Sequence, residues 1–347
     1  MDRRTFLKSG VVAATGAGAA STAMAAPMQK TSSVAVLETV LSQRFAQGYL
    51  RDRADRFALR IKELTEGRII LNFKAASPAN TSFECVCNSS ATAYFGTEAE
   101  HLSEHRGLAY FSALPKEFSL TPEYFTAWLA GGGGQSHWDA IASDFGVKSF
   151  AVGHSGRRAG VWADRDLENL SSLVGLQGDV TGMAAEIVKR LGVKISAANS
   201  DEAALVAPLM GPTAWLADDG ARRRFWFRDG IYQDGVVLSF GLSQQVWQRF
   251  SAADQAVIAT CANEAYHQSL AEHAAHEQAV APHLFAAYAI QKRTLPDDIL
   301  KAMQHMAMQL LSEWRSADAA TARIHDSYMQ FRNTMTGSID PFVSKVS

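Results

Sequence analysis

The sequence contains little cysteine and no long apolar run. Three cysteines among 347 residues are too few for a disulfide scaffold. Cys85 and Cys87 stand one residue apart without a nearby histidine, which is a poor arrangement for a metal site. We therefore interpret these two thiols and Cys261 as structural and partly buried. No stretch approaches the ~20 continuous apolar residues that a membrane-spanning helix needs.

An excess of positive charge is also missing. The 33 Lys and Arg residues are outnumbered by 35 Asp and Glu residues, which gives a net charge of −2. Nucleic-acid binding depends on basic surfaces that neutralise phosphates, so this balance argues against it. The basic run 222–224 precedes the aromatic run 225–227. We interpret the two runs as an edge strand with a charged start rather than as a surface for stacked bases.

The N-terminus carries the marks of an export signal. Arg3 and Arg4 precede a mildly apolar stretch rich in alanine and glycine, residues 9–23, and small residues around Ala25 suit a signal peptidase. This order is typical of a twin-arginine signal peptide with cleavage after Ala25. We assign residues 1–25 to that signal and expect the mature protein in the periplasm.

Helix and strand patterns alternate through the first two thirds of the chain. Phe57, Ile61 and Leu64 recur at helical spacing, a glycine follows as a stop, and residues 68–73 are rich in strand formers. Residues 184–195 repeat this order of apolar helical face, glycine and short strand. Such alternation predicts α/β layers, and the mature length predicts two domains.

The last third of the chain is predicted to be helical. Ser251 and Asp254 resemble a capping box that opens a long helix, which continues with few breakers until Pro282. After Pro296, apolar residues at helical spacing form another stripe that reaches towards Phe331. Its methionines are more typical of core packing than of a cofactor site.

Several segments match those of one known family in their order and in their residue patterns. The matching residues are 60–68, 113–115, 127–129, 132–135, 153–162, 175–192 and 327–331. They resemble the substrate-binding subunits of TRAP (tripartite ATP-independent periplasmic) transporters, especially the branch associated with 2-oxo acids and related monocarboxylates. The resemblance covers essentially the whole mature chain, with a shortened region between Gly192 and Gly211.

The resemblance implies a two-lobed, periplasmic-binding-protein-like α/β fold with a long helix bracing both lobes. Lobe I would hold residues 26–150, lobe II residues 151–236, residues 237–282 would return to lobe I with the long helix, and the C-terminal helices in residues 283–347 would pack on lobe II. A small organic solute would be enclosed between the lobes. Membrane permease subunits would then receive it, driven by an ion gradient.

The positions that bind the solute in the family carry different residues here. Asp179 stands where the family has an arginine that pairs with the solute carboxylate. Arg158 stands where this branch has a glutamine that contacts solute and metal, and Pro208 and Leu209 replace an acid–aromatic pair. Glu100 falls in place of a tyrosine. The expected ligand-binding residues are thus Arg157, Arg158, Trp162, Asp179, Glu100, Leu209 and Met210, and we expect no metal and no other cofactor.

Arg158 and Asp179 allow two interpretations. They can line a pocket of altered polarity for a cationic, zwitterionic or neutral solute. They can equally form an internal salt bridge that fills the cleft and abolishes binding. A buried pair with both partners present is tolerated, whereas either charge left alone in a closed cleft is costly.

Other chemical motifs are weaker. The glycine run 131–134 is not followed by the Gly-Lys-Ser/Thr of a phosphate-binding loop. Residues 153–157 lack the last glycine of a nucleophile elbow, and no catalytic triad follows from the spacing, so we expect no enzyme. His273, His276 and Glu277 can share one helix face, for which a solvated surface is a simpler explanation than a metal site.

The function predicted from the sequence is therefore that of a TRAP transport receptor. An exported sensor or accessory protein that kept the fold and lost carboxylate binding is the alternative, and a recruited enzyme is the least favoured class. The expected partners are a small-molecule solute, in the first place an organic acid, and the permease subunits. A second copy of the chain is a further candidate partner, and nucleic acid is not.

The export signal gives the first testable prediction. Replacing Arg3 and Arg4 together by lysine should trap the precursor in the cytoplasm, because the twin-arginine route depends on that pair. Cell fractionation followed by immunoblotting measures the change, and the unaltered precursor should appear in the periplasm about 25 residues shorter. Export of the double variant at an undiminished level would contradict the assignment.

Overall fold

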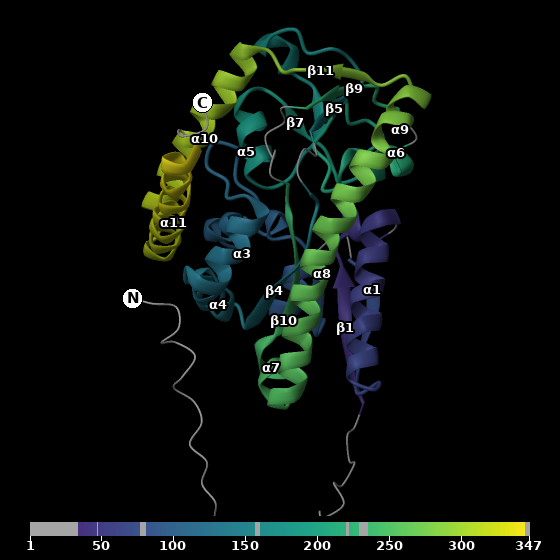
Figure 1. The fold of residues 1–347 in the computed structure, drawn as a ribbon, viewed down its shortest axis with the longest axis vertical. Coiled ribbons are helices and arrows are strands. Elements are labelled where there is room, and N and C mark those ends of the chain that lie inside the picture. Colours follow the sequence, from purple (N-terminus) through teal and green to yellow (C-terminus); the bar gives the residue numbers. More distant parts are fainter. Residues whose placement is uncertain are drawn as a thin grey trace, which may run out of the picture. The chain divides into compact units, whose positions relative to one another are not determined.

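Two β-sheets with helices packed around them organise the chain (Figure 1). The computed structural model describes residues 34–46, 48–76, 81–156, 160–219, 222–228 and 235–343. One sheet has five strands in the order β2-β1-β3-β10-β4, and the other has six in the order β11-β9-β5-β8-β6-β7. Both sheets mix parallel and antiparallel pairs. The α/β class predicted from the sequence is confirmed.

The five-stranded sheet contains β1 (Ala35–Leu41), β2 (Ile69–Ala75), β3 (Ala93–Gly96), β4 (Val147–His154) and β10 (Val237–Ser243). Its helices are α1 (Gly48–Leu64), α2 (Ser82–Cys87), α3 (Pro122–Gly131), α4 (Gly134–Ser143) and α7 (Gln244–Arg249). The short 3₁₀ helices η1 (Gln43–Phe45), η2 (Glu98–Glu100) and η3 (Arg106–Phe111) belong to the same half.

The six-stranded sheet contains β5 (Val161–Ala163), β6 (Gln177–Asp179), β7 (Lys194–Ile195), β8 (Leu205–Val206), β9 (Phe225–Phe227) and β11 (Gln291–Arg293). The elements η4 (Leu170–Leu173), α5 (Gly182–Arg190), α6 (Pro212–Asp219) and α9 (Ala281–Ala287) lie in this half. The remaining helices are α8 (Ala252–Ala279), α10 (Asp297–Ala317) and α11 (Ala319–Val343).

The predicted helix-to-strand units are confirmed. Helix α1 ends at Leu64 and β2 begins at Ile69, parallel to β1. Between them Gly67 takes a φ of +80° and donates its N–H to Lys62 O at 2.7 Å, a helix ending that favours a residue without Cβ. The second unit is α5 followed by β7. Helix α1 begins earlier than its apolar spacing indicated, at Gly48.

Helix α8 runs along both halves of the molecule (Figure 1). Ser251 caps it as predicted, accepting the N–H of Asp254 at 3.1 Å. Tyr266 and other buried residues pack its N-terminal part on β4, and Arg53 of α1 pairs with its Glu272 at 2.7 Å. Near its C-terminal end Glu277 accepts the N–H of Thr213, in the first turn of α6, at 3.0 Å. Helix α8 therefore touches elements of both sheets.

Two chain crossings connect the sheets beside α8. Ser155, just after β4, and Val236, just before β10, bond each other through Ser155 N–H to Val236 O at 2.9 Å and Val236 N–H to Ser155 Oγ at 2.8 Å. His154 N–H donates to Ser269 Oγ of α8 at 2.8 Å. The crossings are thus tied to each other and to the long helix.

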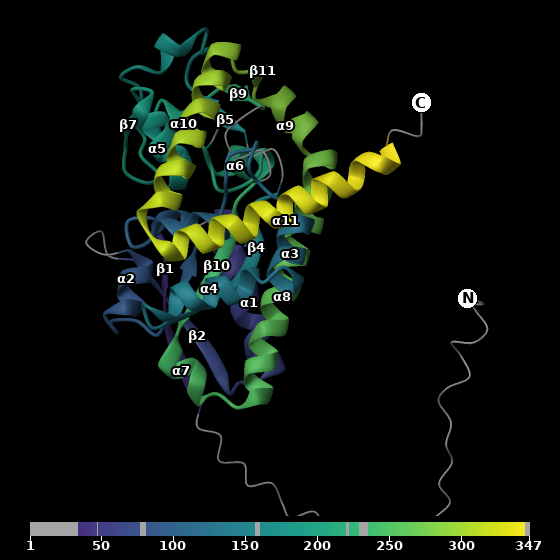
Figure 2. The same cartoon turned by 90° about the vertical axis from the view of Figure 1, so that its left-hand side faces the viewer.

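The structure corrects two expectations about the elements. The predicted stripe towards Phe331 is broken at Asp318, which accepts the N–H of Thr321 at 2.7 Å and starts a separate helix, α11. Helix α10 packs on α5 and η4, while α11 packs on η3, α3 and α4 (Figure 2). The run 225–227 is not an edge strand, because β11 lies outside it. The lobe boundaries proposed from the sequence stay a prediction.

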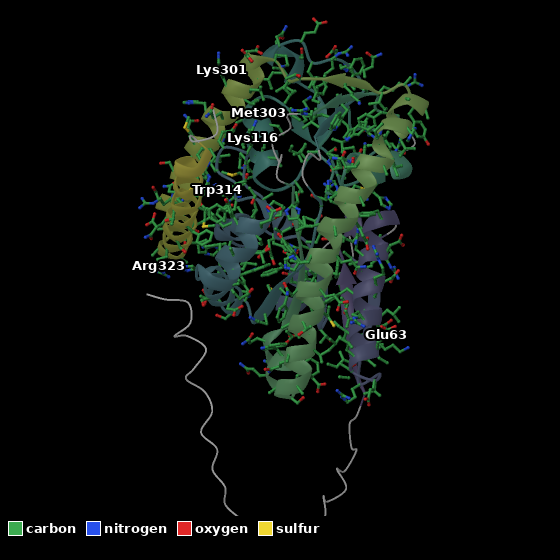
Figure 3. The ribbon with its side chains drawn as sticks, in the orientation of Figure 1. Glu63, Lys116, Lys301, Met303, Trp314 and Arg323 are labelled. Carbon is green, nitrogen blue, oxygen red and sulfur yellow. The ribbon has the colours of Figure 1, made fainter. Side chains whose placement is uncertain are left out.

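Burial explains the orientation of α10. Met303 and Trp314 are buried on it, whereas Lys301 is exposed (Figure 3). The Arg106 guanidinium lies 5.4 Å from the centre of the Trp314 ring, a cation–π contact with the five-stranded half. The helix therefore presents one apolar face inward, as its 3.6-residue spacing requires.

The packing of α8 against the segment before α6 gives the second prediction. A Cβ on Gly211, just before α6, would lie 2.5 Å from His273 Cε1 and 2.7 Å from Glu277 Oε1. Gly211→Ala should therefore lower the free energy of unfolding by about 1–3 kcal/mol, through overpacking. Urea unfolding followed by circular dichroism measures the change.

Gly131→Ala is the matched control, because no atom lies within 4 Å of its added Cβ and alanine suits a helix. The control should keep or slightly raise the unfolding midpoint. Equal midpoints for the Gly211 and Gly131 variants would disprove the close packing of α8 against Gly211.

Candidate functional site

The candidate site lies where strand ends from the two sheets meet. In the five-stranded sheet β1 and β3 run parallel, so η1 and η2 both follow carboxyl ends at one edge. Asp179 is the last residue of β6 in the six-stranded sheet. Ligands of open α/β sheets bind outside such carboxyl ends. The geometry therefore points to the space among η1, η2 and the end of β6.

A three-residue ion cluster occupies this space. Arg44 of η1 forms a salt bridge through Nη2 with Asp179 Oδ1. Its Nε lies 3.3 Å from Oε1 of Glu100, in η2. Exposure of the side chains is 10% for Arg44, 3% for Asp179 and 16% for Glu100. A guanidinium from one half of the molecule thus neutralises a buried carboxylate from the other.

The backbone around Asp179 strengthens this link. The N–H of Asn199 donates to Asp179 Oδ2 at 2.8 Å. Asn199 takes a φ of +56°, which asparagine tolerates better than most residues. Its Nδ2 donates to the backbone O of Gln43 in η1 at 3.4 Å. Two side chains, Arg44 and Asn199, therefore reach across between the halves in opposite directions.

The electrostatics of the cluster are unbalanced. Burial lowers the pKa of Arg44, but the charges of Asp179 and Glu100 outweigh burial and leave that pKa raised. Burial raises the pKa of Glu100, and the Arg44 charge and the Ser42 hydroxyl oppose the rise. Two carboxyl groups face one guanidinium, so the cluster attracts a further positive charge more readily than a negative one.

Buried polar contacts hold η2 in place below the cluster. Thr97 Oγ1 donates to the backbone O of Val237 at 2.9 Å. Glu98 is fully buried and accepts a hydrogen bond from Tyr94 Oη at 2.6 Å. Burial raises the pKa of Glu98 to about 7, against the opposing hydrogen bonds of Tyr94 and its neighbours. These contacts anchor η2 and so position Glu100.

The structure brings together only part of the predicted site. Asp179 and Glu100 both contact Arg44. Arg157 and Arg158 lie outside the described residues. The predicted pairing of Asp179 with Arg158 therefore stays untested, while the contact with Arg44 is a partner that the sequence analysis missed.

The other predicted residues are buried side chains. Trp162 is fully buried in an aromatic cluster with Trp226 and Phe285. Leu209 and Met210 are buried in the main core between β8 and α6. Trp162 pairs with Val206, which pairs with Asp179, so Trp162 and Asp179 stand two strand spacings apart, roughly 10 Å. Whether these side chains touch a solute stays a prediction.

The histidine face of α8 is engaged in packing. A Cβ on Gly156 or Gly211 would meet the His273 ring at 1.9 Å or 2.5 Å, so this imidazole lies against the crossing after β4 and against the segment before α6. Glu277 caps α6 and Glu272 pairs with Arg53. In the described part of the chain no three potential ligands gather into a metal-binding group. His276 is exposed, as expected for a solvated face, whereas His273 and Glu277 are half-buried against neighbouring segments.

One feature of the sequence could have indicated Arg44 as a residue of the site. Arg44 comes three residues after β1, and this strand ends in the apolar pair Val40 and Leu41. A charged residue directly after a buried strand is a common place for a binding side chain. The strand order that brings it to Asp179 is not readable from this local pattern.

Comparisons with known proteins identify the fold. No protein-family model matches the chain. The monocarboxylate 2-oxoacid-binding periplasmic protein of Nostoc sp. (strain PCC 7120) is 24% identical over 293 residues, 80% of this chain and 79% of that protein. This likeness spans most of both chains.

Two solved structures extend the comparison. A TRAP periplasmic solute-binding protein from Pseudoalteromonas atlantica T6c, with bound sodium and pyruvate, matches with a TM-score of 0.78 at 18% identity, over 90% of this chain and 98% of that chain. One from Chromohalobacter salexigens DSM 3043, with bound (S)-(+)-2-amino-1-propanol, matches with a TM-score of 0.72 at 13% identity, over 88% and 98%. The fold is therefore that of TRAP periplasmic solute-binding proteins, as predicted.

One further property bears on the class of protein. Among the helices of the described residues, none combines the length and the apolar character needed to cross a membrane.

The ion cluster gives the third prediction. Arg44→Met leaves Asp179 and Glu100 buried without a cation, so it should cost about 3–5 kcal/mol of unfolding free energy. Asp179→Asn should lower the unfolding free energy by less, because Arg44 still pairs with Glu100 in this variant. The double variant should lose less than the sum of the two single losses, since the pair acts as a unit.

Urea unfolding of the four proteins measures this coupling. Arg51→Met is the control, because Arg51 and Asp55 form an exposed pair with side-chain exposures of 38% and 50%, and such pairs contribute little. The control should barely move the midpoint. Strictly additive losses in the cluster variants would show that Arg44 and Asp179 do not interact.

Proposed function

We propose that this chain is the periplasmic solute-binding receptor of a TRAP-type secondary transporter. It captures a small organic solute between its two lobes and delivers it to membrane permease subunits. The carrying observation is the buried ion cluster of Arg44, Glu100 and Asp179 at the strand ends where the two sheets meet. The shared fold and the binding-protein relative support the same function.

The mechanism follows from contacts made by both halves. A solute seated at the cluster touches η1 and η2 on one side and the end of β6 on the other. It binds the closed form better than the open form because only the closed form offers all contacts, and this difference shifts the population towards closure. The crossings at Ser155 and Val236 and the long helix α8 are the segments about which the halves would move.

Several further properties belong to this proposal. Location in the periplasm is supported by the periplasmic relative, and export through the twin-arginine pathway by Arg3 and Arg4. A purely binding role, without catalysis, is supported by the binding proteins that resemble the chain. Assembly with permease subunits follows from the transporter class, and a homodimer remains a candidate assembly.

The solute of this chain should differ from that of its relatives. The Nostoc relative is named for monocarboxylate 2-oxo acids, and the Pseudoalteromonas protein holds pyruvate. Here Asp179 stands where the resemblance places a carboxylate-binding arginine, and Arg44 is already shared by Asp179 and Glu100. Pyruvate-like acids should therefore bind poorly. The Chromohalobacter protein, with an amino alcohol, supports the view that this fold accepts other chemistry.

A specific observation favours a second candidate function. Arg44 of one half forms a buried salt bridge with Asp179 of the other, and an internal pair of this kind would suit an exported sensor or accessory protein that has lost carboxylate binding. Such a protein would keep the closed form through its internal ion pair and would signal to a membrane partner.

Solute binding gives the fourth prediction. In a thermal-shift screen of the mature protein against organic acids, amino acids, amines and sugars, at least one small solute should raise the melting temperature, since a ligand of the folded state must stabilise it. Pyruvate at the same concentration should give a markedly smaller shift. Calorimetry then measures the affinity of each hit.

The screen also separates the two candidate functions. A protein that binds no member of the panel, while Arg44→Met gains binding, would support the sensor and overturn the receptor. Tight binding of pyruvate by the unmodified protein would contradict the role given to Asp179.

A further inference from the structure

A second acidic residue of η2, Glu98, lies in the interior of the five-stranded half. Its exposed fraction is 0%, and its Oε1 accepts a hydrogen bond from Tyr94 Oη of β3 at 2.6 Å. The same hydroxyl lies 3.4 Å from Ser149 Oγ of β4. Glu98 Oε2 forms no hydrogen bond with any described residue. One carboxyl group of η2 is thus enclosed in the core, whereas Glu100 faces the ion cluster.

The Tyr94 ring is held in place on several sides. A Cβ on Gly241 of β10 would lie 1.9 Å from Tyr94 Cε1, so the ring lies directly on the backbone of that strand. Phe83 and His101 contact it edge-on, with ring centroids 5.7 Å and 5.2 Å away. The Tyr94 hydroxyl therefore has a fixed position, and Glu98 must stay in the core to accept its hydrogen bond.

Uncharged groups surround this carboxyl. Four side chains from four elements lie close enough to favour its ionised form by hydrogen bonding: Tyr94 of β3, Trp138 of α4, Ser149 of β4 and Ser239 of β10. Two further titratable side chains lie nearby, His101 after η2 and Cys87 of α2. Burial lowers the pKa of His101 to about 3 and raises the pKa of Cys87 to about 11, so both are neutral near pH 7.

The charged residues of β4 and α4 do not compensate Glu98. Lys148 and Asp139 pair with each other, and Lys148 lies on the opposite face of β4 from Ser149, because successive strand residues alternate. No cation is among the groups that most influence the Glu98 pKa. Burying a carboxylate without a cation is costly, so these surroundings favour the protonated, neutral form of Glu98.

The folded protein therefore keeps a proton that the unfolded chain releases. Burial raises the pKa of Glu98 from its ordinary value of 4.5 to about 7, against the hydrogen bonds of Tyr94 and its neighbours. Because this folded-state pKa lies above the unfolded-state value, the stabilisation by the proton is complete below about pH 4.5. It is lost as the pH rises through about 7.

Glu98 adjoins the contacts that η2 makes at the boundary between the halves. Glu100, two residues further on, pairs with Arg44, which in turn pairs with the other half. The backbone O of Ala99 accepts a hydrogen bond at 3.4 Å from Oγ1 of Thr181, the residue before α5. Because η2 has only three residues, a movement of Glu98 out of the core would displace both contacts.

We propose that Glu98 is a proton-operated switch that controls how firmly η2 contacts the six-stranded half. With its proton, Glu98 stays buried against Tyr94, and η2 keeps both contacts. When the proton passes to water, the carboxylate is stabilised by reaching solvent, so η2 loosens, Thr181 loses its acceptor and Arg44 keeps only its acidic partner in the other half. The inference goes beyond the proposed function, because it requires no bound solute.

The pH dependence of unfolding tests the titration of Glu98. Urea unfolding of the mature protein and of Glu98→Gln between pH 5 and pH 8 gives two unfolding constants at each pH. Their ratio, wild type over variant, should rise on the order of fiftyfold across this range, because only the wild type loses the buried proton. The histidines contribute equally to both proteins and cancel in the ratio. Glu117→Gln, at an exposed position, is the matched control and should give a ratio that does not change with pH.

Tyr94→Phe is a second variant that does not alter the acid itself. It removes a hydroxyl that favours ionised Glu98, so the folded-state pKa of Glu98 should rise further. The loss of stability should then level off at a higher pH than in the wild type. This shift tests the titration independently of whether Glu98→Gln folds, and circular dichroism checks the fold of each variant.

Hydrogen exchange read by mass spectrometry tests the effect on η2. After correction for the intrinsic pH dependence of exchange, peptides that contain η2 and peptides that contain Thr181 should exchange at least about tenfold faster at pH 8.5 than at pH 6 in the wild type. Neither set should change with pH in Glu98→Gln. Peptides from residues 319–337 of α11 are the internal control and should exchange alike in both proteins.

Three results would overturn the switch. An unfolding ratio for Glu98→Gln that stays constant with pH would show that Glu98 does not titrate in this range. A rising ratio with pH-independent exchange of η2 would show that the acid titrates without moving η2. Faster exchange of η2 with unchanged exchange at Thr181 would refute the link to the six-stranded half. All three are measured without solute, so the receptor proposal is tested separately by the thermal-shift screen.

Discussion

The salt bridge between Arg44 and Asp179 is the contact on which the arrangement of the two halves depends. Both charges are almost removed from water, and a buried charge without its partner costs several kcal/mol. Separating the halves would therefore have to be compensated by water entering around both groups. Asn199 adds two hydrogen bonds at the same place. The two halves of this chain are thus held together in part by their own charges.

The rest of the fold positions those charged side chains next to one another. Parallel pairing of β1 with β3 aligns η1 and η2 at a single edge of the five-stranded sheet, and the buried contacts of Thr97 and Glu98 hold η2 there. Helix α8 bonds through Ser269 to His154, at the crossing after β4. Because Thr97 bonds to Val237, next to the crossing at Val236, η2 connects the cluster to that crossing.

Local patterns predicted the local structure well. The Gly67 stop, the Ser251 cap and the apolar spacing of α1 and α5 all act through bonds within a few residues, so the helix-to-strand units and the start of α8 could be read directly. The apolar spacing continues across Asp318 and therefore does not indicate the helix break there. The place of residues 225–227 inside their sheet depends on pairing with distant strands. The family resemblance indicated Asp179 as a residue of the site, but it did not indicate its partner Arg44.

The sequence by itself determined the element types, the family-like order of segments and the presence of an acid where a carboxylate-binding arginine is expected. These are properties of single residues and short windows, since propensity and capping operate locally. Only the tertiary structure decided which cation neutralises Asp179. That pairing depends on strand order and on the meeting of two sheets, which bring together residues far apart in the chain, and no local pattern specifies such distances.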